Sequence, residues 1–233
     1  MAQQLPEGIN ENELAQWIES SLAESKNFLS SGLQGQTLIY KKMHPALVIK
    51  VPHGKGLMYL LNKRMLKHEH DVYLKLNGFA GSPKCYGMVA NKYLALEYIE
   101  GKPIRNLRPV DEDNYFKSLL EYIKQLHTYD VAHMDLKKRD NLLVSSNDQP
   151  RIIDFGAAVI YKRGFHPFNH FWYGLARQFD YNAWFVHKYR DKPENTIEEG
   201  DRQYYSYTLV ERVSRKIKRF YKDRLRYVFK SRR

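Results

Sequence analysis

HMDLKKRDN at residues 133–141 and IIDFG at residues 152–156 flank a segment with two apolar runs and a polar centre. The apolar runs, residues 142–144 and 151–153, are short and typical of strands. The polar residues 145–149 between them are typical of a tight turn. We therefore predict a β-hairpin, which would hold the two flanking stretches close to each other.

These flanking stretches carry side chains that suit a hard metal ion. Asp135 and Asn141 lie in the first stretch, and Asp154 lies in the second. Two carboxylates and an amide are oxygen ligands of the kind that Mg²⁺ prefers, whereas Zn²⁺ favours thiolate and imidazole groups. The sequence therefore predicts a magnesium site beside the hairpin.

A lysine and a glutamate further upstream form a predicted ion pair. Lys50 lies near the end of the predicted strand 46–51. Packing would hold its aliphatic stem there, while its ammonium group reaches a phosphate. Glu69 shares the apolar face of a helix predicted over residues 58–76. A buried carboxylate is costly unless a cation meets it, and Lys50 is the nearest candidate upstream. A purely structural ion pair is the alternative interpretation.

Phosphoryl transfer needs metal ligands, a cation for the nucleotide phosphates and a carboxylate that orients the acceptor hydroxyl. Lys50, Glu69, HMDLKKRDN and IIDFG occur in the order and approximate spacing of the protein-kinase signature set. The chain thus resembles a protein kinase over roughly residues 30–160. The resemblance implies ATP and Mg²⁺ as cofactors. It also implies an α+β, two-lobed protein-kinase-like fold, with a small, mainly antiparallel sheet N-lobe carrying one key helix and a shortened, mainly helical C-lobe.

The same resemblance implies a role for each candidate site residue. Asp135 would be the catalytic base, and Lys137 would contact the transferred phosphate. Asn141 and Asp154 would hold the metal. Lys50 would bind the nucleotide phosphates, and Glu69 would orient the lysine. Backbone groups of Glu97 and Ile99, in the hinge-like LALEYIEG, would contact the adenine edge. Gly32 and Gly35 would be a remnant phosphate loop.

Three departures from the kinase pattern bear on these roles. Asn141 follows Asp135 by six positions instead of five, so an extra residue must bulge from the loop. SGLQGQ at residues 31–36 lacks the full G-x-G-x-x-G. No A-P-E stretch follows IIDFG, and the remaining chain is too short for the usual activation segment. This truncation is similar to that of RIO-type and Bud32-type atypical kinases, and of bacterial kinases that phosphorylate Kdo or heptose sugars of the lipopolysaccharide inner core.

The pattern along the chain suggests three parts. Residues 1–29 are predicted to be an N-terminal helical leader, residues 30–100 the kinase N-lobe, and residues 101–233 the C-lobe with a basic amphipathic C-terminal helix. A clean helical stripe leads into the catalytic stretch: Phe116, Leu119, Leu120, Ile123 and Leu126. Three polar residues on a later predicted helix have no predicted chemical role: Asp180, Asn182 and Lys188.

The net charge is strongly positive, at +12, with a pI near 9.5. Residues 211–233 hold eleven Lys or Arg against two acidic residues, so partners that carry phosphate are favoured. The C-terminal helix is predicted to pack its apolar stripe on the C-lobe, or to make peripheral contact with an anionic membrane. Charge alone also suggests nucleic acid, but no nucleic-acid motif accompanies it, so we do not expect that partner.

Cysteine content and hydropathy bear on the compartment. The single cysteine, Cys85, excludes an intramolecular disulfide and fits a reducing environment. The N-terminus shows no basic region followed by an apolar run, and no segment has bilayer-spanning length. We expect a cytoplasmic protein, or one held peripherally at the inner face of the membrane.

The favoured function is an ATP-dependent kinase that acts on a hydroxyl acceptor. A protein serine or threonine is the first choice, because residues 135–137, Asp-Leu-Lys, are like the serine/threonine-kinase loop. A lipopolysaccharide inner-core sugar is the close alternative. A pseudokinase that binds nucleotide without turnover is a further alternative, suggested by the Asn141 spacing and the incomplete glycine loop.

Overall fold

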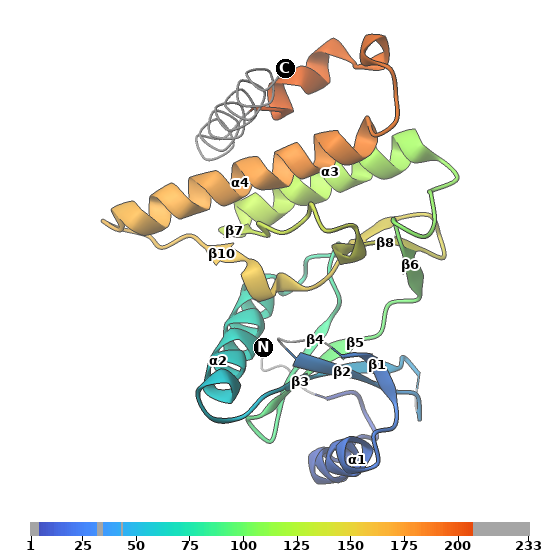
Figure 1. The fold of residues 1–233 in the computed structure, drawn as a ribbon, viewed down its shortest axis with the longest axis vertical. Helices are drawn as coiled ribbons and strands as arrows, with labels where there is room; N and C mark the ends of the chain where they lie inside the picture. Colours follow the sequence, from blue (N-terminus) through green and yellow to red (C-terminus); the bar gives the residue numbers. More distant parts are fainter. Residues whose placement is uncertain (1–4, 32–34, 43, 207–233) are drawn as a thin grey trace, which may run out of the picture.

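The structure of the chain is a computed structural model that describes residues 5–31, 35–42 and 44–206. Its N-terminal part is a five-stranded sheet with the order β1-β2-β3-β5-β4 (Figure 1). Every neighbouring pair in this sheet is antiparallel. The strands are β1 (Phe28–Ser31), β2 (Gly35–Tyr40), β3 (Leu47–Pro52), β4 (Cys85–Val89) and β5 (Tyr93–Glu97).

A helix covers each face of this sheet. Helix α1 (Glu11–Ala23) packs Leu14 and Ile18 into a cluster with Ile49 of β3. Helix α2 (Gly56–Lys75) packs into a second cluster that includes Leu94 of β5. Side chains alternate between the two faces of a strand, so Lys50 points to the face opposite Ile49 and toward α2. The alternation in residues 47–51 thus places Lys50 between β3 and α2, in the interior of the molecule.

The C-terminal part is mainly helical. Helices α3 (Glu112–Thr128) and α4 (Pro167–Lys188) lie side by side and share the larger core (Figure 1). All five residues of the predicted stripe on α3 are buried. Asp111 caps α3 by accepting a hydrogen bond from the backbone N–H of Asn114.

Short strands and turns connect the helices and lie between the two lobes. The predicted hairpin is present as β8 and β9, and β6 pairs with β8, while β7 pairs with β10. The elements are β6 (Gly101–Pro103), β7 (Val131–Ala132), β8 (Leu142–Ser145), β9 (Pro150–Ile152), β10 (Val159–Ile160) and the 3₁₀ turns η1 (Arg139–Asn141), η2 (Phe155–Ala157), η3 (Glu194–Thr196) and η4 (Glu199–Tyr204).

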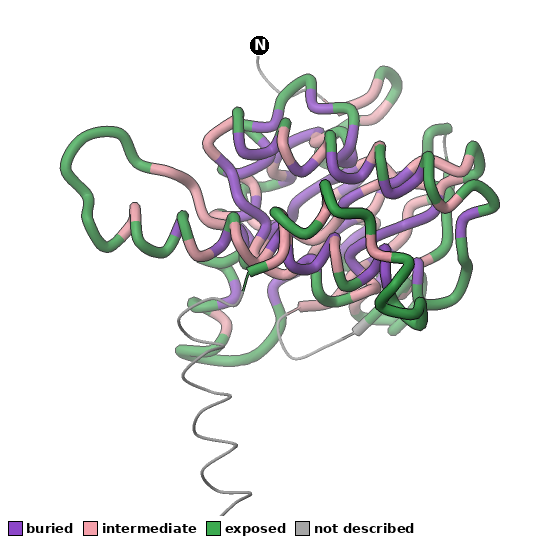
Figure 2. Tube along the Cα trace, turned by 90° about the horizontal axis from the view of Figure 1, so that it is seen from above, coloured by how far each residue is buried: buried purple, intermediate pink, exposed green. Residues whose placement is uncertain are grey.

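The arrangement confirms the predicted α+β, two-lobed fold. Figure 2 shows buried residues running through the interior, with exposed segments around the periphery. Within the described ranges, no helix has both the length and the apolar character needed to cross a membrane. Gly32 and the predicted basic C-terminal helix lie outside the described residues.

Candidate active site

The loop between β7 and β8, residues 133–141, brings Asp135 and Asn141 together. We call it the catalytic loop. Asn141 Nδ2 donates to the backbone oxygen of Asp135 at 3.0 Å and to its Oδ2 at 3.1 Å. A tight turn takes up the extra residue, because Lys138 N donates to Asp135 O at 3.3 Å and Asn141 N donates to Lys138 O at 3.0 Å. Asn141 therefore reaches Asp135 despite the longer spacing. Its amide oxygen is then the acceptor that remains for a metal.

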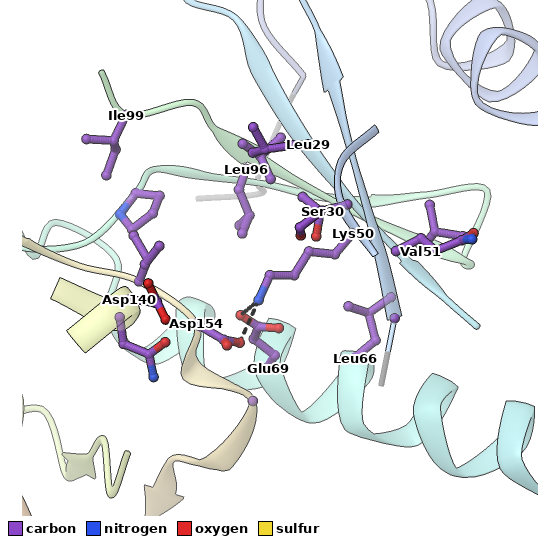
Figure 3. A pocket seen from close by; sticks show the side chains of 18 of the residues that line it. Leu29, Ser30, Lys50, Val51, Leu66, Glu69, Leu96, Ile99, Asp140 and Asp154 are labelled. Carbon is purple, nitrogen blue, oxygen red and sulfur yellow. Dashed lines mark hydrogen bonds and ion pairs between the residues drawn. The ribbon is translucent and has the colours of Figure 1, made fainter. Parts of the chain in front are cut away.

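Lys50 joins two carboxylates from distant parts of the chain. Its Nζ donates to Glu69 Oε1 at 2.6 Å and to Asp154 Oδ1 at 2.9 Å (Figure 3). Glu69 is only 3% exposed, so the cation offsets the cost of burying its carboxylate. The predicted ion pair is present, and the structure adds Asp154 as a second partner.

The three charges control the ionisation of this cluster. Burial alone would lower the pKa of Lys50, but Glu69 and Asp154 outweigh it and raise the pKa to about 12. Burial alone would raise the pKa of Asp154, but the Lys50 ammonium holds it below its ordinary value. At neutral pH, Lys50 can therefore bind phosphate oxygens and Asp154 can bind a cation.

Aromatic rings support the site from behind. The ring centroids of Tyr73 and Phe155 lie 5.2 Å apart, and those of Phe155 and His133 lie 4.7 Å apart. Phe155 N also donates to Glu69 Oε1 at 3.1 Å. The Phe155 position therefore ties α2 to the catalytic loop through both packing and a hydrogen bond.

Backbone geometry on the two sides of the hairpin is held by His133. Its Nε2 donates to Ile153 O at 3.0 Å, so its Nδ1 is the nitrogen that accepts from Asp135 N at 3.3 Å. Asp154, which follows Ile153, has a φ of 67°, in the left-handed region that a non-glycine residue adopts only when its surroundings hold it. His133 thus links the backbones that carry Asp135 and Asp154.

Asp180 on α4 holds the catalytic loop through hydrogen bonds to its backbone. Its Oδ2 accepts from His133 N at 2.8 Å, and its Oδ1 accepts from Met134 N at 2.8 Å. His127 Nε2 lies 3.1 Å from the same Oδ2. The Asp180 side chain is fully buried, and Met134 has a φ of 68°. Sequence reasoning assigned no role to Asp180, although a carboxylate inside an apolar helix face is a signal that partners must exist.

A cleft of about 760 Å³ lies between the sheet and the catalytic loop. Its lining includes Lys50, Glu69 and Asp154 (Figure 3). Asn141 lines it as well. Gly35 also lines it, and a Cβ there would lie 2.9 Å from the backbone oxygen of Val51, so only glycine fits. The cleft is within the range of volumes that hold small ligands and cofactors.

The predicted hinge forms one wall of the cleft. Glu97 N donates to Lys84 O at 2.8 Å, and Tyr98 N donates to Ala46 O at 2.9 Å. Within the described residues, no backbone carbonyl accepts from the N–H of Ile99, which also lines the cleft. Of the two predicted adenine contacts, Ile99 therefore has its N–H available, whereas Glu97 has only its carbonyl.

Two neighbouring lysines of the catalytic loop occupy different places. Lys138 lines the cleft, with its Nζ 3.8 Å from Asp154 Oδ2. Lys137, which was predicted to contact the transferred phosphate, is exposed and lies outside the cleft lining. The loop thus places the cation of Lys138, and not that of Lys137, at the cleft.

Replacing each lysine should separate binding from transfer. Lys138→Ala is expected to weaken ATP binding about fivefold with little change in kcat, because it removes a partly exposed charge beside the phosphates. If Lys137 contacts the transferred phosphate, as the resemblance to protein kinases implies, Lys137→Ala is expected to lower kcat about tenfold at saturating ATP. Steady-state kinetics over a range of ATP concentrations checks both. A shift in KM alone for Lys137→Ala would remove its assigned role.

The oxygen ligands suit magnesium without enclosing it. Among the described residues, no three His, Cys, Asp or Glu side chains lie close enough to surround a metal ion. Mg²⁺ in nucleotide sites usually takes one or two protein oxygens and completes its shell with phosphates and water. Asp154 and Asn141, which both line the cleft, can supply that number.

Comparisons with known proteins agree with this geometry. A family model described as the protein kinase domain matches residues 55–185, more than half of the chain. The chain is 35% identical over 111 residues to a serine/threonine-protein kinase, chk-1, of Caenorhabditis elegans, a match covering 45% of this chain and 21% of that protein. It is 25% identical over 149 residues to the dual specificity protein kinase zakA of Dictyostelium discoideum, covering 59% and 19%. The matches span about a fifth of these relatives. Together, the family match and the arrangement of the cleft show that this chain belongs to the protein kinase family.

Proposed function

We propose that this chain transfers the terminal phosphate of ATP, bound with Mg²⁺, to a hydroxyl acceptor. The observation that carries the proposal is the meeting of Lys50, Glu69 and Asp154 at the cleft that Asn141 also lines. Asn141 in turn contacts Asp135. A phosphate-binding cation, metal ligands and an acceptor-orienting carboxylate are thus within one site, as phosphoryl transfer requires.

Each residue has a task that follows from its contacts. Lys50, held by Glu69, binds the nucleotide phosphates and fixes their position. Mg²⁺, when bound to Asp154 and Asn141, neutralises negative charge on the phosphates. Asp135 accepts a hydrogen bond from the acceptor hydroxyl and takes its proton as the phosphate transfers. Asn141 Nδ2 keeps the Asp135 carboxylate in place.

A protein serine or threonine is the first candidate acceptor. Residues 135–137 have the Asp-Leu-Lys of the serine/threonine-kinase loop. The relatives support this choice, since one is named a serine/threonine-protein kinase and another a dual specificity protein kinase.

A lipopolysaccharide inner-core sugar is the second candidate, as in the compact kinases that the sequence resembles. Only a short connection joins Gly156 to α4, which begins at Pro167, so a long peptide-docking segment is lacking there. Burial and the nearby charges of Arg190 and Arg108 lower the pKa of Arg139, which lies within the catalytic loop. An acceptor that carries negative charge, such as an inner-core glycolipid, would find complementary charge at these arginines.

Labelled ATP distinguishes the acceptors. The full chain with Mg²⁺ is incubated separately with a set of serine- and threonine-rich proteins and with purified inner-core lipopolysaccharide. Label on protein serine or threonine is the expected result, and chelation of Mg²⁺ should abolish it. Label on the glycolipid alone would select the second candidate. Binding of ATP without transfer to any acceptor would indicate a non-catalytic nucleotide-binding pseudokinase, and absence of ATP binding would overturn the proposal.

A further inference from the structure

Aromatic side chains at the start of α4 are exposed to solvent. Phe165 is 92% exposed and Phe168 is 83% exposed, and Phe171 and Trp172 follow at 54% and 48%. We call residues 162–172 the aromatic tip. Figure 1 shows that this end of α4 extends beyond α2 and α3, and Figure 2 shows an exposed projection on the same side. Such large exposed aromatic groups in one place mark an interaction surface.

Internal bonds hold the aromatic tip in shape. Asn169 Oδ1 accepts from Lys162 N at 2.7 Å, and Asn169 Nδ2 donates to Ile160 O at 2.9 Å. His170 Nε2 donates to Lys162 O at 2.8 Å. Tyr173, on the inward face of α4, is buried in a cluster with residues of β7 and β10. The helix therefore packs one face on the C-lobe and presents its aromatic face outward.

Within the segment that carries these rings, the charged side chains are all basic. No Asp or Glu occurs between Asp154 and Asp180. The aromatic tip contains Lys162 and Arg163, and the Arg163 side chain is 89% exposed, although it also pairs with Asp130 at 3.7 Å. A partner surface should therefore be negatively charged as well as apolar.

We propose that the aromatic tip binds the interfacial region of an anionic lipid bilayer. Phenylalanine and tryptophan side chains partition into the zone between headgroups and acyl chains, and neighbouring Lys and Arg are attracted to anionic headgroups. Contact between two copies through this surface would bring like charges together, which opposes self-association. This membrane contact lies on α4 and is separate from the one predicted for the C-terminal segment. It requires no phosphoryl transfer.

Trp172 provides a direct reporter of insertion. The full chain is titrated with vesicles of phosphatidylcholine containing phosphatidylglycerol, and with vesicles of phosphatidylcholine alone. We expect binding to the anionic vesicles with a blue shift in emission and quenching by brominated lipid. Trp172→Phe should bind almost as well but lose most of the shift, because Trp184 is buried and Trp17 packs against Tyr40.

Matched substitutions locate the contact. Phe165→Ser/Phe168→Ser should lower vesicle affinity roughly 30-fold, because two rings no longer enter the interface. Lys162→Gln/Arg163→Gln should lower it roughly tenfold at low salt. Leu57→Ser/Leu60→Ser is the control, since it removes two exposed apolar side chains from α2 and should leave affinity unchanged.

Three outcomes would overturn the proposal. The first is wild-type vesicle affinity in Phe165→Ser/Phe168→Ser, which would place any membrane contact elsewhere, including the C-terminal segment. The second is an unchanged Trp172 emission on vesicles. The third is a concentration-dependent dimer in sedimentation that Phe165→Ser/Phe168→Ser abolishes, which would make the aromatic tip a self-association surface. Asp135→Asn should bind vesicles as wild type does, so failure of the kinase proposal would leave this result intact.

Discussion

Asp135→Asn is expected to lower the rate of phosphoryl transfer by about a thousandfold while leaving ATP affinity within about twofold of wild type. The amide has the same shape as the carboxylate and can still accept from Asn141, whose Nδ2 lies 3.1 Å from Oδ2. An amide cannot take a proton from the acceptor hydroxyl, so the loss should appear in kcat. Single-turnover kinetics at saturating ATP, together with a nucleotide-binding titration, measures both quantities.

Asp140→Asn is the matched control for this substitution. Asp140 lies in the same loop and lines the same cleft, but its carboxylate pairs with Arg105 at 3.1 Å and is partly exposed. Loss of such a pair is expected to change the transfer rate less than about threefold. An equal loss in both variants would mean that the loop responds to any charge change, and Asp135 would no longer be singled out as the base.

Sequence reasoning was most successful where local pattern and chemistry agreed. The hairpin was predicted because two apolar runs flank a polar turn, and it is present as β8 and β9. The partner of Glu69 could be predicted because a buried carboxylate needs a cation, and Lys50 supplies it at 2.6 Å. Both inferences depend on residue types and spacings that can be read directly from the sequence.

Element ends were less predictable. An N-terminal helical leader was predicted over residues 1–29, but α1 ends at Ala23 and Leu29 belongs to β1. Ser25 and Asn27 have φ values of 52° and 62°, in a region that no helix continues through. Apolar spacing persisted beyond the helix because Phe28 packs on the same core from a strand.

The contact between Asp135 and Asn141 could not be derived from spacing alone. The extra residue was predicted to bulge from the loop, and a turn within residues 138–141 takes it up while Asn141 still contacts Asp135. Asp180 is a second case, since two of its partners are backbone N–H groups that no side-chain pattern reveals. Sequence patterns identify side chains that need partners more readily than backbone groups that provide them.

The short connection after IIDFG limits how the site can be controlled. In the structure, Lys50 already pairs with Glu69 and Asp154, and Phe155 N already donates to Glu69. Only residues 158–166 lie between the end of η2 and the start of α4. Ordering a long loop by phosphorylation, a common way to assemble a kinase site, has little chain to act on here. The aromatic tip begins within this connection, which therefore carries a binding surface instead of a long mobile loop.

Asp180→Ala is expected to lower the free energy of unfolding by about 3–5 kcal/mol. The substitution leaves the buried N–H groups of His133 and Met134 without their acceptor, and it removes the partner of His127. Met134 would also lose the bond that holds its left-handed backbone, with φ of 68°. Because Asp135 follows directly, kcat should fall even at temperatures where the variant is fully folded. Chemical denaturation measures the stability, and transfer assays well below the unfolding midpoint measure kcat.

Asn182→Ala separates this role from a general need for polar groups on α4. Asn182 is also buried on that helix, but its amide donates to Ser206 O at 2.8 Å and accepts from Ser206 N at 3.1 Å, away from the catalytic loop. Its loss should cost about 1–2 kcal/mol and leave kcat unchanged, because its bonds to Ser206 lie away from the catalytic loop. If Asp180→Ala destabilised the chain but kept wild-type kcat when folded, the carboxylate would be a fold anchor with no part in positioning Asp135.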